Sequence, residues 1–285
     1  MFAQYKRFRK MIYSYPNKAV ISKVIATFIL SIMFSHQVIA SSDLDDPKQI
    51  ISAIENLNWV TEEYPPFNYK DPITGEITGI GVEVLLSIFD KLGVSRDKVE
   101  LKIYPWARGY NQLLNDPQTA LFSTTYSKKR LKEMKFVGPF AVNIVAVIAP
   151  KFSHLSVQHI NDLQGLTIGV IRDDIGEQLL LSEGVQPDSL DKLNSGLSIV
   201  KKLDSGRIDA MSYAHATSQI LFKKANIDAN KFEIVHVLKY SNMGYAFNNK
   251  IDDRILAPMR KALNELIADG TIAQLQMKYG LEHNR

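Results

Sequence analysis

A hydroxyl-rich strand end followed by one arginine is the stretch of this sequence best suited to binding a small ligand. Ser123 and Thr125 lie at the end of an apolar run, and Arg130 follows within a short basic segment. Hydroxyl groups donate hydrogen bonds to carboxylates, and a guanidinium presents a planar fork that matches a carboxylate with two parallel bonds. The alternative is a solvated basic helix face in which Arg130 pairs with Glu133, because most charge runs face solvent. The elements around this stretch must decide between an anion site and a surface segment.

Patterns typical of other chemistries are missing from the sequence. It contains no cysteine, which excludes disulfides, thiolate metal sites and cysteine nucleophiles. The histidines show no H-E-x-x-H spacing, although His215 is expected near a cleft, so we predict no metal site. No G-x-S-x-G or P-loop motif is present, and the glycine pair Gly79 and Gly81 lacks the third glycine of a dinucleotide motif. We therefore expect no cofactor.

The first forty residues are typical of a secretory signal peptide. They hold six basic residues and no acid, then an apolar run at 24–34, and then a small-residue cleavage site ending at Ala40. An uncleaved membrane anchor is the alternative, but the apolar run is shorter than the roughly 20 residues that a spanning helix needs. We expect cleavage after Ala40 and export to the periplasm, with Met11 as an alternative start of translation.

The charge of the remaining chain argues against nucleic acid as a partner. The whole sequence has 34 basic and 30 acidic residues, but removal of the six basic leader residues leaves 28 against 30, a net charge of −2. A nearly neutral protein without a basic stripe offers no electrostatic footprint for nucleic acid. The roughly 245 residues that remain are enough for one core or for a core divided between two lobes.

Strand and helix patterns alternate along the chain, which predicts an α/β protein with mainly parallel sheets covered by helices. Strands are expected at 58–63, 99–104, 120–124, 143–149, 166–171, 208–213, 232–238 and 243–247. Helices are expected within 43–58 and at 79–92, 107–114, 175–181, 197–203, 217–224, 254–268 and 272–278. Ligands of such sheets bind beyond the carboxyl ends of the strands. The segments 61–64, 104–106 and 123–125 fall at these ends.

Extended segments near 141–143 and 240–243 divide the pattern in two. Where two crossings join two sheets, one lobe is built from both ends of the chain. We predict a signal peptide at 1–40, lobe 1 at 41–142 and 243–285, and lobe 2 at 143–242.

Six short motifs occur in an order and spacing that resemble the family 3 extracellular solute-binding proteins, the periplasmic amino-acid receptors of ABC importers. The resemblance covers residues 58–280. The motifs are EYPPF at 63–67, Gly75 and Gly79 before an amphipathic helix, SKKR at 127–130 leading to FVGPF at 136–140, TIGV at 167–170, GRIDA at 206–210 and DGT at 269–271.

The resemblance implies a type II periplasmic-binding-protein fold, with two α/β lobes that close on a ligand about a two-strand hinge. It implies that Tyr64 covers the ligand, that Trp106 stacks opposite, and that Arg130 binds a carboxylate beside Ser123 and Thr125. It further implies a monomer that delivers a small-molecule ligand to an ABC permease in the inner membrane.

The sequence departs from this family where an amino group would bind. The two family acids that hold the α-amino group fall on Thr61 and near Ala214, which are not acids. The family's Gly-Thr-Thr turn is replaced by Asp173-Asp174-Ile175. An ordinary α-amino acid is therefore not the only ligand to consider, and Thr61 remains a predicted ligand contact by position.

Further charged residues near these positions have both a structural and a ligand-binding interpretation. Asp174 and Glu177 form a D-x-x-E pattern, which favours helix capping over a contact of Asp173 or Asp174 with a ligand amine. Arg108 is either a second anion contact or the exposed face of its helix. Glu62, like its neighbour Glu63, is a less favoured replacement for the missing amine acids.

The leading hypothesis is a periplasmic binding protein, not an enzyme, for a small carboxylate-bearing solute. One alternative is an enzyme resembling the periplasmic cyclohexadienyl dehydratases, with Glu63 or His215 as the general acid that such chemistry needs. Another is a receptor that reports ligand binding to a separate membrane sensor.

Overall fold

The computed structural model describes residue 44 and residues 46–281. The expected signal peptide at 1–40 lies outside the described residues. Within the described part of the chain, no helix combines the length and the apolar character needed to cross a bilayer.

One eight-stranded mixed sheet forms the framework, in the order β4-β1-β5-β10-β6-β9-β7-β8. The β4-β1, β1-β5, β7-β9 and β7-β8 pairs are parallel, whereas β5-β10, β10-β6 and β6-β9 are antiparallel. The strands are β1 (Asn58–Thr61), β4 (Leu101–Ile103), β5 (Thr119–Thr125), β6 (Met134–Pro150), β7 (Ile168–Ile171), β8 (Leu190–Leu193), β9 (Ala210–Ala214) and β10 (Phe232–Asn248). A separate hairpin pairs β2 (Tyr69–Lys70) with β3 (Ile77–Thr78).

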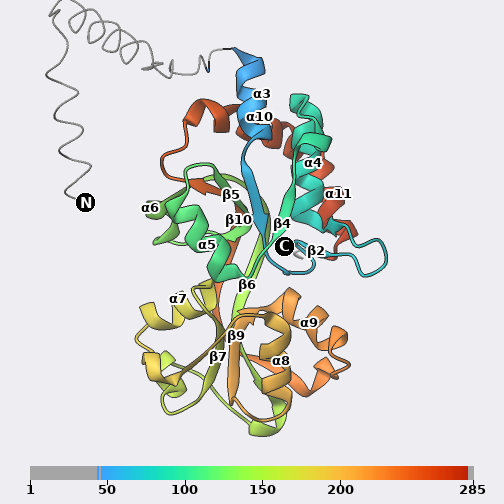
Figure 1. Cartoon of the computed structure of the whole chain (residues 1–285). Helices are drawn as coiled ribbons and strands as arrows, with labels where there is room; N and C mark the ends of the chain where they lie inside the picture. The colour runs from blue at the N-terminus through green and yellow to red at the C-terminus, as the bar shows by residue number, and fades with distance from the viewer. Residues whose placement is uncertain (1–43, 45, 282–285) are drawn as a thin grey trace, which may run out of the picture. The chain divides into compact units, whose positions relative to one another are not determined.

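The two 17-residue strands β6 and β10 join the parallel parts of the sheet (Figure 1). We call β1, β4 and β5 with their helices the first half, and β7, β8 and β9 with theirs the second half. The sequence predicted β6 only from Asn143 onward and divided β10 in two. Both strands are continuous because three register shifts along the β6–β10 ladder absorb the irregular positions. The strand β8 and the β2–β3 hairpin were missed, because both are short and lack an apolar run.

Helices cover both halves of the sheet (Figure 1). Those of the first half are α3 (Pro47–Glu55), α4 (Ile80–Leu92), α5 (Trp106–Asn115), α10 (Asp253–Ala268) and α11 (Thr271–Lys278). Those of the second half are α7 (Ile175–Ser182), α8 (Gly196–Asp204) and α9 (His215–Lys224), and the four-residue α6 (Arg130–Glu133) lies between β5 and β6. Short 3₁₀ turns lie at Arg96–Lys98, Lys151–Ser153, Ile160–Leu163, Pro187–Ser189 and Ala229–Lys231.

Helix α4 illustrates how the sequence pattern becomes packing. Its apolar positions, among them Leu85, Ile88 and Phe89, are spaced three and four residues apart and are fully buried. The helix ends at Gly93, whose φ of 73° is left-handed and suits glycine. Phe89 meets the edge of Trp59 on β1 at a centroid distance of 5.4 Å, which fixes the helix against the sheet.

Helix α7 lies very close to β9. A Cβ atom at Gly176 would lie 2.7 Å from the backbone oxygen of Ser212, so only glycine allows this approach. The contact determines where the first residue before the helix, Asp174, is placed.

We expect Gly176→Ala to destabilise the protein. Overpacking of this kind costs about 1 to 3 kcal/mol. About 1 kcal/mol changes Tm by roughly 2 to 4 °C in a domain of this size, so the melting temperature is expected to fall by roughly 2 to 12 °C. Differential scanning calorimetry measures it directly. Gly109→Ala in α5 is the control, because its nearest neighbour is the flexible end of Leu121 at 3.2 Å. Equal melting temperatures for the two variants would show that the α7–β9 approach is not tight.

Candidate functional site

Arg130 lies at the centre of the candidate site and is fully buried. It begins α6, where its backbone N–H donates to Ser127 Oγ at 3.1 Å. The surface alternative is wrong, because Glu133 accepts from Tyr110 Oη at 2.6 Å and lies 3.8 Å from Lys129 Nζ instead. The short helix thus directs Arg130 inward and leaves its lysine neighbours outside.

The guanidinium of Arg130 reaches both halves of the molecule. Its Nη1 donates to the Thr125 carbonyl at 3.2 Å, and its Nη2 makes a long contact of 3.5 Å with the Asp173 carbonyl. The same Nη2 lies 3.7 Å from Asp174 Oδ1. Its Nε is buried and has no hydrogen-bond partner among the described residues. The protein therefore orients the guanidinium of Arg130, and its Nε–H remains as a donor for a group outside the protein.

The first turn of α5 supports one face of this guanidinium. The Arg130 carbon Cζ lies 4.8 Å from the Trp106 ring centroid and 5.4 Å from that of Tyr110, within cation–π range. Trp106 Nε1 donates to the Asp173 carbonyl at 2.9 Å, which links the two halves. Trp106, which was predicted to stack on the ligand, therefore contacts Arg130, the predicted carboxylate-binding residue. Tyr110 contacts Arg130 as well and was not predicted.

Tyr64 is buried on the segment that follows β1. Its ring stacks on Phe67 at 5.4 Å and meets the edge of Tyr213 at 5.5 Å, and its hydroxyl accepts from Asn143 Nδ2 at 3.0 Å. Burial raises the pKa of Tyr64 well above its ordinary value, so the phenol is neutral. Asn143 Oδ1 and Tyr213 Oη are buried and accept or donate no hydrogen bond within the described residues. Tyr64 thus brings together polar groups of β6 and β9 at the site.

The three predicted hydroxyl residues have different surroundings. Ser123 has a left-handed backbone with φ of 62°, and its buried Oγ has no partner in the described part of the chain. Thr125 is buried, and its carbonyl holds Arg130. Thr61 Oγ1 donates to the Phe122 carbonyl at 3.3 Å, so its hydrogen already serves the sheet. Of the three hydroxyl groups, that of Thr61 is already used within the sheet, whereas that of Ser123 has no partner among the described residues.

The expectation that Asp174 caps α7 is wrong. Asp174 occupies the N-cap position, but its side chain forms no capping hydrogen bond with any described residue, and Oδ2 is buried and unpartnered. Glu177 instead accepts from the Asp173 N–H at 2.5 Å and pairs with Lys192 Nζ at 2.6 Å. The pattern failed because the left-handed turn at Asp173, with φ of 60°, directs the Asp174 carboxylate toward Arg130.

Glu62 is a second buried carboxylate at the site. It is 9% exposed and follows the end of β1 by one residue. Burial raises the pKa of Glu62 well above its ordinary value, the Asp174 carboxylate raises it further, and Arg130 opposes both. Burial likewise raises the pKa of Asp174, with Arg130 as the main opposing group. The position of Glu62 at the end of a strand indicated that it could lie near a ligand site, but nothing in the sequence indicated that its side chain is buried.

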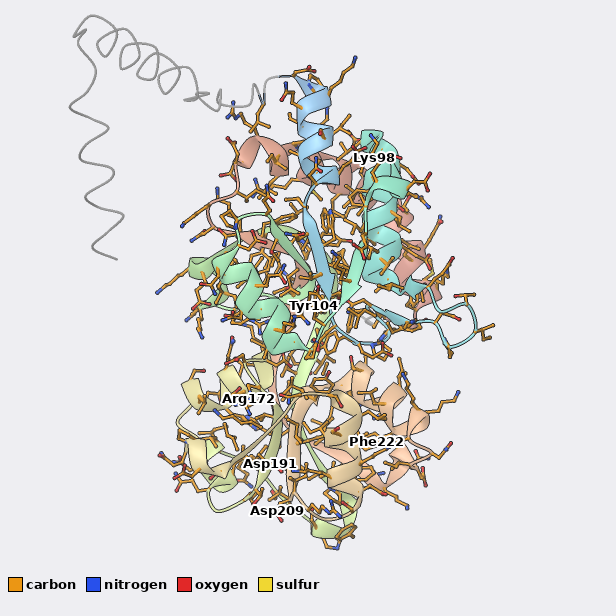
Figure 2. The ribbon with its side chains drawn as sticks, viewed as in Figure 1. Lys98, Tyr104, Arg172, Asp191, Asp209 and Phe222 are labelled. Carbon is orange, nitrogen blue, oxygen red and sulfur yellow. The ribbon has the colours of Figure 1, made fainter. Side chains whose placement is uncertain are left out.

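A cavity of about 370 Å³ lies between the halves and includes Glu62 in its wall. Tyr104, labelled in Figure 2, and Pro105 line it from the first half. The second half contributes 194–197 and Leu221. Lys224 Nζ pairs with Glu63 Oε1 at 2.8 Å beside this cavity.

Two predicted candidates lie apart from Arg130. Arg108 is exposed on α5, and its Cζ lies 3.9 Å from the Tyr104 ring centroid, which agrees with a helix-face residue. His215 begins α9, lies 3.3 Å from Gln219 through its Nε2, and has a pKa lowered by burial. Among the residues that the structure describes, no group of His, Asp and Glu side chains is arranged to hold a metal ion.

Comparison of the sequence with known proteins identifies a family of binding proteins. The family model for bacterial extracellular solute-binding proteins, family 3, matches residues 57–282. The probable amino-acid-binding protein YxeM of Bacillus subtilis is 23% identical over 75% of this chain and 79% of its own length. A probable amino-acid ABC transporter-binding protein of Haemophilus influenzae is 26% identical over 76% of this chain and 80% of its own.

Solved structures share the fold. An ancestral arginine-binding protein bound to arginine is 26% identical, with a TM-score of 0.65 over 78% of this chain and 97% of its own. The arginine-, lysine-, histidine-binding protein ArtJ of Geobacillus stearothermophilus is 20% identical, with a TM-score of 0.68 over 80% of this chain and 97% of its own.

We expect Glu62→Gln to stabilise the ligand-free protein at neutral pH. A folded state that raises a carboxyl pKa binds more protons than the unfolded state, so stability falls as pH rises above the unfolded value near 4.5. The groups that act on Glu62 or feel its charge are Asp174, Arg130, Tyr64 and Tyr213. Glutamine removes the penalty, so the gain in Tm is expected to be larger at pH 7 than at pH 5.

Glu63→Gln is the matched control, because its carboxylate is half-exposed and paired with Lys224. It should leave the melting temperature nearly unchanged, since exposed ion pairs contribute about 0 to 1 kcal/mol. A loss of stability in Glu62→Gln at pH 7 would contradict the unpaired, buried state of Glu62.

Proposed function

The chain belongs to the bacterial extracellular solute-binding proteins of family 3, and from that premise we propose that it captures a small carboxylate-bearing solute, an amino acid or a related compound, for import by an ABC permease. Its fold is that of the type II periplasmic binding proteins. We further propose that the exported chain is a periplasmic monomer, released by cleavage after Ala40.

The observation that carries this proposal is the buried guanidinium of Arg130 with its unpartnered Nε. A buried donor without a partner is costly, and a carboxylate accepts from Nε and Nη2 in the planar geometry that arginine presents. Ser123 Oγ is a second unpartnered group that suits the same anion. Arg130 and Ser123 are therefore assigned to the ligand carboxylate.

Binding strength requires more than these contacts. Hydrogen bonds to charged groups contribute about 1.5 to 3 kcal/mol each, whereas a micromolar ligand needs about 8 kcal/mol. We propose that closure of lobe 1 (41–142 and 243–285) on lobe 2 (143–242) supplies the remainder by excluding water. The Trp106–Asp173 hydrogen bond and the Tyr64–Tyr213 ring contact cross this boundary and support a closed state. In this proposal β6 and β10 form the hinge.

Tyr64 and Trp106 are assigned to the aromatic walls of the site, because both are buried beside groups of the opposite half. Thr61 and Thr125 are assigned to positioning, since Thr61 bonds within the sheet and Thr125 holds Arg130. The amino-acid-binding relatives support binding over catalysis. Glu63, one of the two candidate acids of the dehydratase alternative besides His215, is paired with Lys224 and accepts from the Lys70 N–H, which does not favour Glu63 in that role.

Titration calorimetry of the purified protein with the common L-amino acids and small organic acids tests the proposal. We expect at least one α-amino acid to bind with a dissociation constant in the micromolar range or below. Absence of heat and of thermal stabilisation with every compound would overturn it.

We expect Arg130→Met to weaken that binding on the order of a hundredfold, because it removes two hydrogen bonds of the charged kind while keeping an unbranched side chain. Arg108→Met is the matched control, since Arg108 is exposed and stacks on Tyr104. Circular dichroism establishes that both variants are folded. Equal loss of affinity in the two variants would sink the assignment of Arg130.

A further inference from the structure

We propose that Glu62 and Asp174 form a cation subsite beside Arg130, so that the preferred ligand has a net charge of +1. The inference rests on the proposed function and extends it by naming the charge class of the ligand. The family's usual amine-binding acids are replaced by Thr61 and Ala214, so these two carboxylates are a different source of negative charge.

The buried charges balance within the protein only while either Glu62 or Asp174 keeps its proton. Arg130 is one buried cation, whereas Glu62 and Asp174 are two buried carboxylic acids. The neighbouring Lys224–Glu63 and Lys192–Glu177 pairs each neutralise themselves. A zwitterionic ligand adds no net charge and leaves the site at −1 when both acids ionise. A ligand of net charge +1 neutralises it, and an unbalanced buried charge is strongly disfavoured.

Apart from the Arg130 Nε donor and the hydroxyl groups, the unpartnered polar atoms at the site are acceptors, which call for donors on the ligand. Asp174 Oδ2 and Asn143 Oδ1 are acceptor atoms that are buried without a hydrogen bond from any described residue. The Glu62 carboxylate, nine-tenths buried, likewise accepts none from residues 44 and 46–281. An ammonium supplies three N–H donors and a guanidinium five, with no acceptor. An organic cation could therefore donate the hydrogen bonds that these acceptor atoms lack.

The space beside Glu62 suits an extended side chain. The cavity of about 370 Å³ that Glu62 lines also includes the apolar surfaces of Leu197 and Leu221 and the ring of Tyr104. A chain of methylenes packs on such a surface while its charged end reaches a carboxylate. Asp174, only 3.7 Å from the carboxylate-binding Arg130, is placed to take the ammonium of the same α-carbon. Glu62 then takes a second cationic group.

The raised pKa of Glu62 agrees with this arrangement. Without a cation, burial and the Asp174 carboxylate favour retention of the proton on Glu62. A bound cation favours the ionised carboxylate, so binding is expected to release a proton. Calorimetry in two buffers of different ionisation enthalpy detects such a release as a difference in apparent binding enthalpy.

L-arginine and L-citrulline are the probes that test the proposal, because they have nearly the same shape and differ by one positive charge. We expect the protein to bind L-arginine more tightly than L-citrulline on the order of tenfold or more. Glu62→Gln is expected to reduce this preference to about twofold or less and to abolish proton release. Asp174→Asn is a second variant, expected to weaken both probes together because both have an α-ammonium group. Glu233→Gln is the matched control and should retain the preference, because Glu233 is exposed and does not line the cavity.

The outcomes separate this inference from the proposed function. Equal binding of the two probes, or a preference that survives Glu62→Gln, would overturn the cation subsite. The proposed function would still stand in that case if Arg130→Met weakened both probes, since both have an α-carboxylate. L-lysine and L-norleucine form a second matched pair. If neither L-arginine nor L-lysine bound but a neutral amino acid did, only the proposed ligand charge of +1 would be rejected. If no amino acid bound, both proposals would be rejected.

Discussion

Burial of one guanidinium in the interior is the constraint on which the candidate site depends. An arginine cannot lose its charge at physiological pH, so its buried donors require partners that are placed with care. The Thr125 and Asp173 carbonyls, the Asp174 carboxylate and the rings of Trp106 and Tyr110 meet this requirement only in part. The unpartnered Nε makes the site chemically incomplete and therefore suited to an anionic group.

The fold brings these partners together from distant parts of the chain. Arg130 follows β5 of the first half, whereas Asp173 and Asp174 precede α7 of the second half. The close approach of Gly176 to Ser212 holds α7 against β9, and the 17-residue strands β6 and β10 connect the two halves. Because one guanidinium contacts both halves, the arrangement of the halves and the shape of the anion site depend on each other.

Much of this could be predicted from the sequence. Alternating patterns indicate the α/β class because helix and strand periodicities differ, and Arg130 was identified by its type and its place after a strand. The family prediction is confirmed. The hydrophobic pattern also located most helices to within a few residues, since their buried faces follow a regular spacing.

The features of the fold and of the site that were not predicted depend on contacts between distant residues, which local sequence patterns do not encode. Asp174 fits a capping motif, but a left-handed residue before it changes the direction of its carboxylate. The burial of Glu62 is a tertiary property that the residues around it in the sequence do not indicate. The continuity of β10 was missed because its register shifts interrupt the apolar alternation.

The central claim is that Arg130 binds the carboxylate of the ligand, and deletion of that carboxylate from the ligand tests it most directly. L-arginine and agmatine differ by this group alone, and calorimetry with the wild-type protein and Arg130→Met gives a complete cycle of four affinities. The account predicts a large preference of the wild-type protein for L-arginine and almost none in Arg130→Met. An equal preference in both proteins would contradict it, because the carboxylate would then be bound elsewhere.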